Sequence, residues 1–164
     1  MPLTRVRVVQ SGKNAQPATG TGVDARFGQG MVLEGYTVRA IEARAGGELT
    51  VDLLWRAEAA AAESVVVFVH LLGETYNPAT AGPVWAGHDS PPAMGGCPVV
   101  LWRPGDSIVD RHILAIDPAA PSGRYRVEVG VYRAADGERL SWSSADDTDG
   151  GDHLILEAEV GLDP

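Results

Sequence analysis

Apolar and polar positions alternate along much of this chain. From Leu49 to Trp55 every second side chain is apolar, and Thr50 and Asp52 face the other way. The stretches Tyr125 to Val131 and Leu154 to Val160 repeat the pattern. A period of two puts one face of a strand against a core and the other in water, so the pattern predicts half-buried antiparallel strands.

The stretch Val65 to Leu72 differs, because it is apolar on both faces except at His70. It is also rich in β-branched residues, so it predicts a central strand that is covered on its outer face as well. Further strands are expected at Thr4 to Gln10, Val32 to Glu42, Val84 to His88, Ser107 to Ile116 and Arg139 to Ser143. The Ala-rich stretch Ala57 to Glu63 is too short for a stable helix and is expected to be a loop.

Turn residues separate these stretches at regular intervals. The chain holds 20 glycines and 11 prolines, and Asp136-Gly137 is a hairpin signal. Many short strands with regular turns predict an all-β fold, a two-sheet antiparallel β-sandwich of about eight or nine strands. Its topology is immunoglobulin-like or jelly-roll. A length of 164 residues fits one domain, 1–164, in which 1–23 is an N-terminal strand plus a flexible segment.

Two segments lack a clear period, Ser11 to Gln29 and Glu74 to Leu101. Long loops on a rigid sandwich are where binding residues concentrate. The second segment and its end are rich in ring-bearing and polar side chains, which we interpret as a candidate ligand-binding surface: Tyr76, Trp85, His88, Asp89 and Trp102. Aromatic faces suit carbohydrate, although rings that close the ends of the sandwich would give the same pattern.

Charge and cysteine content exclude several classes of protein. The formal net charge is −9, which disfavours nucleic acid and anionic membrane surfaces as partners. No apolar run reaches about 18 residues, so no direct membrane insertion is expected. The lone Cys97 cannot form an internal disulfide, and nothing near it in the sequence would activate a thiol.

The candidate chemistry is sparse. A zinc site needs three or four converging ligands. Of the four histidines, His70 and His112 lie on predicted strands and could be neighbours across a sheet, and we interpret them as polar groups satisfied locally. Asp110 is expected to point inward and to pair with Arg103 or Arg124, or to cap a turn, because a buried carboxylate needs partners. No combination of acid, base and nucleophile emerges, so the chain is not expected to be an enzyme.

The densest acidic stretch lies near the C-terminus. Asp146, Asp147, Asp149 and Asp152 surround two glycines, and calcium prefers several oxygen ligands on a flexible turn. The stretch lacks the spacing of an EF-hand and its terminal glutamate. It is therefore interpreted as a solvated loop, with calcium as the one cofactor to test.

An ordered series of short motifs covers roughly residues 24 to 160: DARFG at 24–28, LEGY at 33–36, LLW at 53–55, VFVHL at 67–71, HDSPP at 88–92, WRPGD at 102–106, VDRH at 109–112, GRY at 123–125, GVY at 130–132 and GERL at 137–140. The series resembles the β-sandwich accessory domain found after the membrane region of bacterial polytopic glycosyltransferase-like proteins of the mannosyltransferase type. In that family catalysis resides in the membrane part, so the resemblance carries over no catalytic residue.

The resemblance implies a non-catalytic accessory module that binds a glycan or a protein partner. It would stand on the extracytoplasmic face of the cell envelope if the chain is part of a membrane protein, and in the cytoplasm otherwise. The alternative is a purely structural or protein-docking domain, and a stand-alone enzyme is the third hypothesis. The sequence leaves the ligand and the oligomeric state open.

Overall fold

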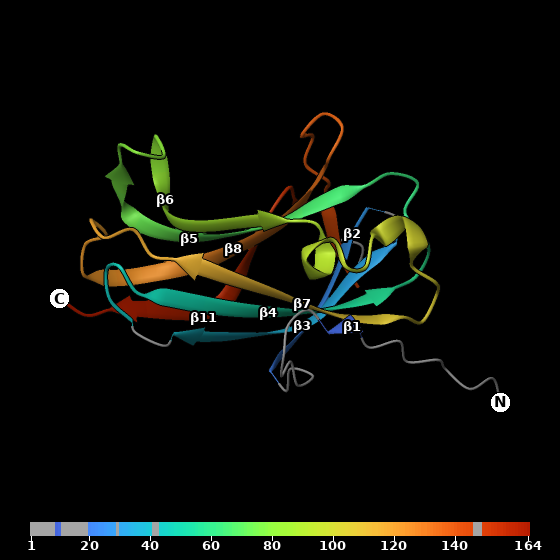
Figure 1. Ribbon diagram of the computed structural model, residues 1–164, viewed down its shortest axis with the longest axis horizontal. Coiled ribbons are helices and arrows are strands. Elements are labelled where there is room, and N and C mark those ends of the chain that lie inside the picture. The colour runs from blue at the N-terminus through green and yellow to red at the C-terminus, as the bar shows by residue number, and fades with distance from the viewer. Residues whose placement is uncertain (1–8, 11–19, 29, 41–42, 146–148) are drawn as a thin grey trace.

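The computed structural model describes residues 9–10, 20–28, 30–40, 43–145 and 149–164. Figure 1 shows two packed layers of strands, with β5 and β6 above β3 and β4. Within the described residues the strands are β1 (Val9–Gln10), β2 (Thr21–Phe27), β3 (Met31–Ala40), β4 (Glu48–Ala57), β5 (Val65–Asn77), β6 (Gly82–Ser90), β7 (Ser107–Ala115), β8 (Gly123–Arg133), β9 (Trp142–Ser144), β10 (Asp149–Gly151) and β11 (Leu154–Leu162). The predicted β-sandwich is confirmed, with more strands than expected.

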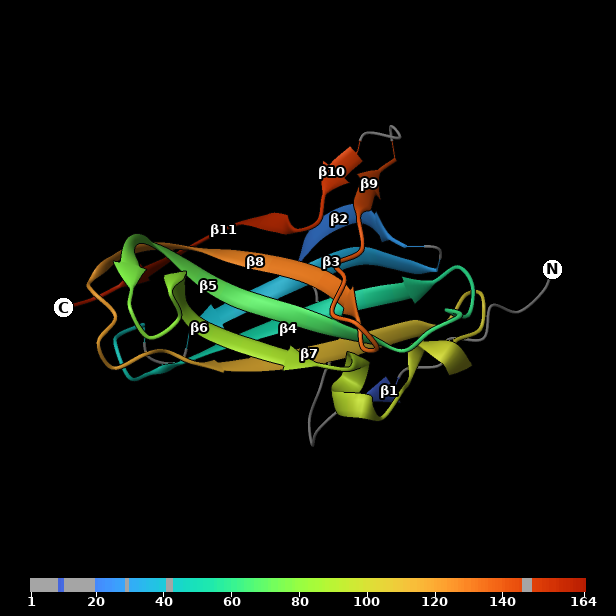
Figure 2. The same ribbon diagram turned by 90° about the horizontal axis from the view of Figure 1, so that it is seen from above.

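The chain passes several times from one sheet to the other, for example from β4 to β5 and from β6 to β7. One sheet has the order β1-β7-β4-β3-β2-β9-β10 and the other the order β11-β8-β5-β6. All neighbours are antiparallel except β1 and β7. Pairing of β4 with β7 in one sheet and of β5 with β8 in the other matches strands B, E, C and F of an immunoglobulin-like sandwich. Figure 2 shows the β9–β10 pair projecting beside β2.

A tyrosine at the start of β8 supports the same assignment. The Tyr125 hydroxyl donates to the Pro121 carbonyl oxygen over 2.6 Å. A tyrosine in this position that bonds to backbone a few residues upstream is the tyrosine corner of immunoglobulin-like folds. The topology that the sequence left open is therefore immunoglobulin-like.

The core lies between the sheets and follows the predicted alternation. Leu49, Val51, Leu53 and Trp55 of β4 are all fully buried, and the Trp55 ring meets Phe27 of β2 edge to face at 5.7 Å. Burying an aromatic side chain of this size contributes roughly 2–3 kcal/mol. Because the apolar face of each alternating strand is buried in the core, only the opposite, outward face can carry a binding site.

The structure corrects both segments that were expected to be irregular. In the first, residues 21–27 form β2; the alternation there is broken by a bulge between Gly22 and Ala25. In the second, β5 runs on to Asn77 and pairs with β6. Irregular backbone begins only after Ser90, with the short 3₁₀ turns η1 (Pro92–Gly95) and η2 (Val99–Leu101).

Asn77 explains why the β5–β6 hairpin closes where it does. Its side-chain oxygen accepts a hydrogen bond from the Ala79 N–H at 3.0 Å, and its amide nitrogen donates to the Val84 carbonyl at 2.9 Å. Asparagine favours such turns because its side chain mimics a backbone group.

Two other strand predictions are adjusted. Of the stretch Thr4 to Gln10, residues 9–10 form β1, and residues 4–8 lie outside the described part of the chain. Of Arg139 to Ser143, only the end belongs to β9, while Arg139 makes an isolated bridge to Tyr132. Over the described ranges, no helix is long and apolar enough to cross a membrane.

Candidate ligand-binding face

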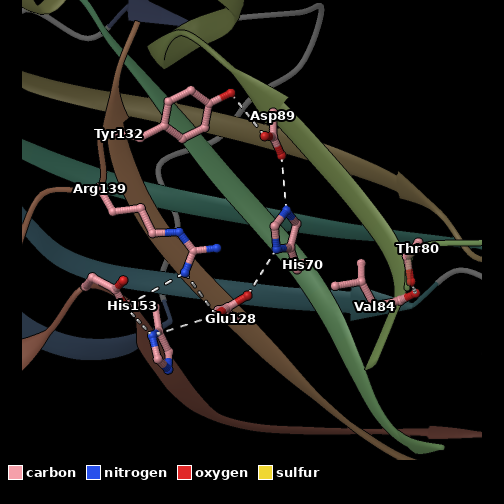
Figure 3. Close-up of polar contacts among 9 residues, drawn as sticks. His70, Thr80, Val84, Asp89, Glu128, Tyr132, Arg139 and His153 are labelled. Carbon is pink, nitrogen blue, oxygen red and sulfur yellow. Dashed lines mark hydrogen bonds and ion pairs between the residues drawn. The ribbon is translucent and has the colours of Figure 1, made fainter. Parts of the chain in front are cut away.

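The outward face of the four-stranded sheet carries a connected group of polar side chains (Figure 3). They come from β5, β6, β8 and the segments before β9 and β11, and we call them the outer-face cluster: His70, Asp89, Glu128, Tyr132, Arg139, Asp152 and His153. Strand register brings them together, since β5 lies between β6 and β8. His70 and Glu128 are 58 residues apart in the sequence, yet they lie directly opposite each other in the antiparallel pairing of β5 and β8.

His70 is held by carboxylates on both sides. Its Nδ1 lies 3.0 Å from Glu128 Oε2, and its Nε2 lies 3.2 Å from Asp89 Oδ1. An ionised carboxylate accepts hydrogen bonds, so the protonated ring, with an N–H on both nitrogens, can donate to both carboxylates at once. Burial by itself would lower the pKa of His70, but the hydrogen bond to Glu128 and the charge of Asp89 outweigh it and raise that pKa.

The cluster rests on an aromatic base. Phe68 is 1% exposed although it lies on the outward face, stacked on His70 at 4.9 Å and on Tyr132 at 6.2 Å. The Arg139 guanidinium covers the ring at 4.5 Å, a cation–π contact. Gly130, opposite Phe68 on β8, makes room for the ring, because a Cβ there would lie 2.1 Å from Phe68 Cζ. This covering confirms the prediction for the doubly apolar strand.

The other side of Glu128 faces further positive charge. Arg139 Nη1 is 4.0 Å and His153 Nδ1 is 3.9 Å from Glu128 Oε1. The hydrogen bond to His70 is the largest influence on the pKa of Glu128, and with these charges it holds that pKa below its ordinary value. His153 also lies 2.7 Å from Asp152, whose pKa is lowered in turn. These ion pairs and hydrogen bonds hold the polar side chains of the cluster in fixed positions.

A hollow of about 430 Å³ lies beside His70 along β6. Its lining mixes polar side chains with apolar ones, including Thr80, Val84 and Asp117. Gly87 keeps the floor open next to His70, since a Cβ there would stand 3.1 Å from His70 Cδ2. The Thr80 hydroxyl donates to the Val84 carbonyl at 2.9 Å, which fixes the wall shown in Figure 3.

A second network is buried between the sheets. Asp110 and His112 of β7 are both fully buried, and His112 Nε2 lies 2.9 Å from Asp110 Oδ2. Asp110 also accepts hydrogen bonds from Trp55 Nε1 at 3.2 Å and from the Ala93 N–H at 2.9 Å. Asp110 therefore points inward and caps a turn as expected.

The arginine partners considered for Asp110 were wrong, because its carboxylate is bonded to Trp55, Ala93 and His112 instead. The backbone N–H of Arg103 donates to Asp106, and the guanidinium of Arg124 pairs with Glu159. His112 also lies apart from His70, since the first points into the core and the second outward. His112 Nδ1 instead meets His88 Nδ1 of β6 at 2.9 Å. Burial, and then the charge of His112, lower the pKa of His88.

The five residues of the predicted binding surface are distributed over different environments. Asp89 belongs to the outer-face cluster, its neighbour His88 points inward, and Tyr76 near the end of β5 is 66% exposed. Trp85 and Trp102 are 6% and 2% exposed, and their indole N–H groups donate to the carbonyls of Thr75 and Cys97. Both tryptophans are core residues, so neither offers a free ring face. The binding role of the other three stays a prediction.

Sequence reasoning missed most of the outer-face cluster. His70 was the one polar residue in an apolar strand, and Glu128 was an outward position on an alternating strand. The available signal was a polar residue between apolar neighbours in each of two predicted strands, His70 in Val65 to Leu72 and Glu128 in Tyr125 to Val131.

The predicted calcium site can be followed only in part. Asp146 and Asp147 lie outside the described residues. Asp149 accepts a hydrogen bond from the Gly151 N–H at 2.9 Å, and Asp152 faces His153 and Arg139. Across the described part of the chain, no group of three or more His, Cys, Asp or Glu residues is placed to hold a metal ion. Calcium binding by this loop stays a prediction.

Topology, tyrosine corner and the outer-face cluster together define an immunoglobulin-like β-sandwich domain with a polar outer face. Among solved structures, the chain is similar to the C-terminal domain of Wzt, with a TM-score of 0.52 over 85% of this chain and 84% of that one. The two sequences are 14% identical, so the likeness concerns the fold. No family model and no curated protein sequence matches the chain.

Proposed function

We propose that this domain is a non-catalytic accessory module that binds a glycan on the outward face of its four-stranded sheet. The observation that carries the proposal is the placement of His70 between Asp89 and Glu128, next to the hollow along β6. Sugars present many hydroxyl groups, which pair with carboxylates and with N–H donors. Groups that are already fixed by one another lose little freedom on binding, so they favour association.

The charges of the cluster favour a neutral glycan. Asp89, Glu128 and Asp152 contribute three carboxylates, which face Arg139, His70 and His153, so the cluster offers no excess of positive charge to an acidic sugar. The whole chain carries a net charge of −9, which also repels anions. Asp89 and Arg139 keep about two fifths of their side chains exposed, 42% and 39%, and can still bond to a ligand.

The resemblance of the motif series to an accessory domain of glycosyltransferase-like proteins supports carbohydrate as the first ligand class to test. It also supports an extracytoplasmic location, if the chain belongs to a membrane protein. The alternative is a docking or purely structural domain. The same face could receive a protein, because ordered polar groups beside a hollow also suit a peptide.

An NMR titration with neutral and uronic acid-containing oligosaccharides tests the proposal. We expect neutral sugars to shift amide signals of β5, β6 and β8 around His70, with weak affinity, since a shallow wet site gains little beyond its ordering costs. His70→Ala should abolish the shifts. Glu34→Gln, which breaks the ion pair with Arg56 on the other sheet, is the matched control and should leave them unchanged.

Shifts that survive His70→Ala, or a stronger response to uronates, would contradict the site as described. If no sugar perturbs this face, the docking or structural alternative becomes the better description.

A further inference from the structure

A slot opens between the two sheets on the side where β11 faces β2 and β3. It has a volume of about 230 Å³ and is lined by residues 21–23 of β2, Tyr36 of β3 and residues 154–157 of β11. Strands β2 and β11 belong to different sheets, so no ladder of hydrogen bonds closes this side. The slot is separate from the outer-face cluster and from the hollow along β6.

All three strands that form the slot are irregular there. The register shifts between Gly22 and Ala25 in β2, near Leu33 in β3, and after Ile155 in β11. Bulges redirect side chains and are common beside binding sites. Each of the three strands that line this opening therefore carries such an irregularity.

Tyr36 lines the slot, and its buried hydroxyl has no hydrogen-bond partner among the described residues. The residue as a whole is 3% exposed. A buried hydroxyl without a hydrogen bond destabilises the fold, so such a group needs an explanation. The surrounding side chains cover the hydroxyl, so a ligand that enters the slot and displaces them would supply the missing bond.

The walls restrict what that ligand can be. Val23, Leu154 and Leu156 are apolar, and Glu157 is the single charged residue of the lining. An anion would find no cation there and would be repelled by Glu157. A cavity of about 150 Å³ can hold benzene, so this larger slot has room for a two-ring molecule.

We propose that the slot binds a small neutral aromatic molecule of indole size, with one polar N–H or O–H group that pairs with the Tyr36 hydroxyl. Hydrophobic contact with the walls supplies the affinity, and the hydroxyl selects ligands that carry the polar group.

The test compares indole with indene, which has nearly the same shape and lacks the N–H, by NMR titration of the whole chain. Both should shift the amide signals of residues 21–23 and 154–157, with indole binding about fivefold tighter, the contribution of one hydrogen bond. Indole-3-carboxylate should bind more weakly than indole because of its charge. In Tyr36→Phe the preference for indole over indene should vanish.

Thr37→Val is the matched control. Thr37 Oγ1 is likewise buried without a partner among the described residues, but Thr37 does not line the slot. This variant should keep the fivefold preference. Absence of shifts at the slot up to the solubility limit of indole overturns the proposal, and so does a preference that persists in Tyr36→Phe.

Discussion

Nδ1 of His70 and Oε2 of Glu128 face each other across β5 and β8 at 3.0 Å, and Asp89 engages the other nitrogen of the same ring. The His70 pKa is raised above its ordinary 6.5, so this contact contributes stability that is complete below about pH 6.5 and is lost as pH rises through the raised value. The pH dependence from Glu128 has the opposite sign. Its pKa is lowered, so its contribution to stability is complete above about pH 4.5 and is lost as pH falls through the lowered pKa.

We therefore expect the free energy of unfolding to fall by about 1 kcal/mol on the alkaline side of the His70 titration. Urea unfolding between about pH 5 and 9 measures this, and His70→Gln should flatten the profile in that range. A histidine NMR signal assigned to His70 that titrates at or below 6.5 would contradict the charged state inferred from the geometry.

Asp110 should be among the least replaceable polar residues. Its carboxylate accepts hydrogen bonds from the Ala93 N–H and Trp55 Nε1, and it also faces His112 Nε2. In Asp110→Asn one carboxylate oxygen becomes an NH₂ group that opposes a donor, so we expect a loss of about 3 kcal/mol. Denaturant unfolding measures the loss. Glu157→Gln, on an exposed position, should change stability by less than about 0.5 kcal/mol.

Gly130 should tolerate no side chain. A Cβ would lie 2.1 Å from Phe68 Cζ, and the ring cannot move away easily because Arg139 covers it. We expect Gly130→Ala to cost about 1–3 kcal/mol, as overpacking does. Gly22→Ala is the control, since a Cβ at Gly22 meets nothing within 4 Å. Equal thermal stability of the two variants would show that Phe68 is not held as described.

Met94 offers a stabilising change. It is 66% exposed and has a φ of 52°, in the left-handed region that disfavours side chains. Met94→Gly should remove about 1 kcal/mol of strain and raise the melting temperature by a few degrees. Met94→Ala retains the Cβ and should give no such gain, which separates backbone strain from loss of the methionine side chain.

The sequence predicted the strands whose alternation is unbroken, such as β4 and β8, and it predicted that Asp110 points inward. It could not predict β2, because the bulge after Gly22 interrupts the period there. The outer-face cluster also escaped prediction, because its contacts depend on the register that sets β5 between β6 and β8. Trp85 was assigned to the candidate binding surface for the same reason, since the hairpin register turns its ring inward.

Pairing of β4 with β7 and of β5 with β8 also determines how the chain can fold. Trp55 opposes Ile108, and Val67 opposes Val131, so neither central ladder can form until a long intervening loop has closed. Closing such loops costs conformational entropy before the contacts between the strands stabilise the fold. Sandwiches therefore fold slowly. Stopped-flow refolding should accordingly take milliseconds to seconds, and the local β5–β6 hairpin is the one unit of the four-stranded sheet able to form early.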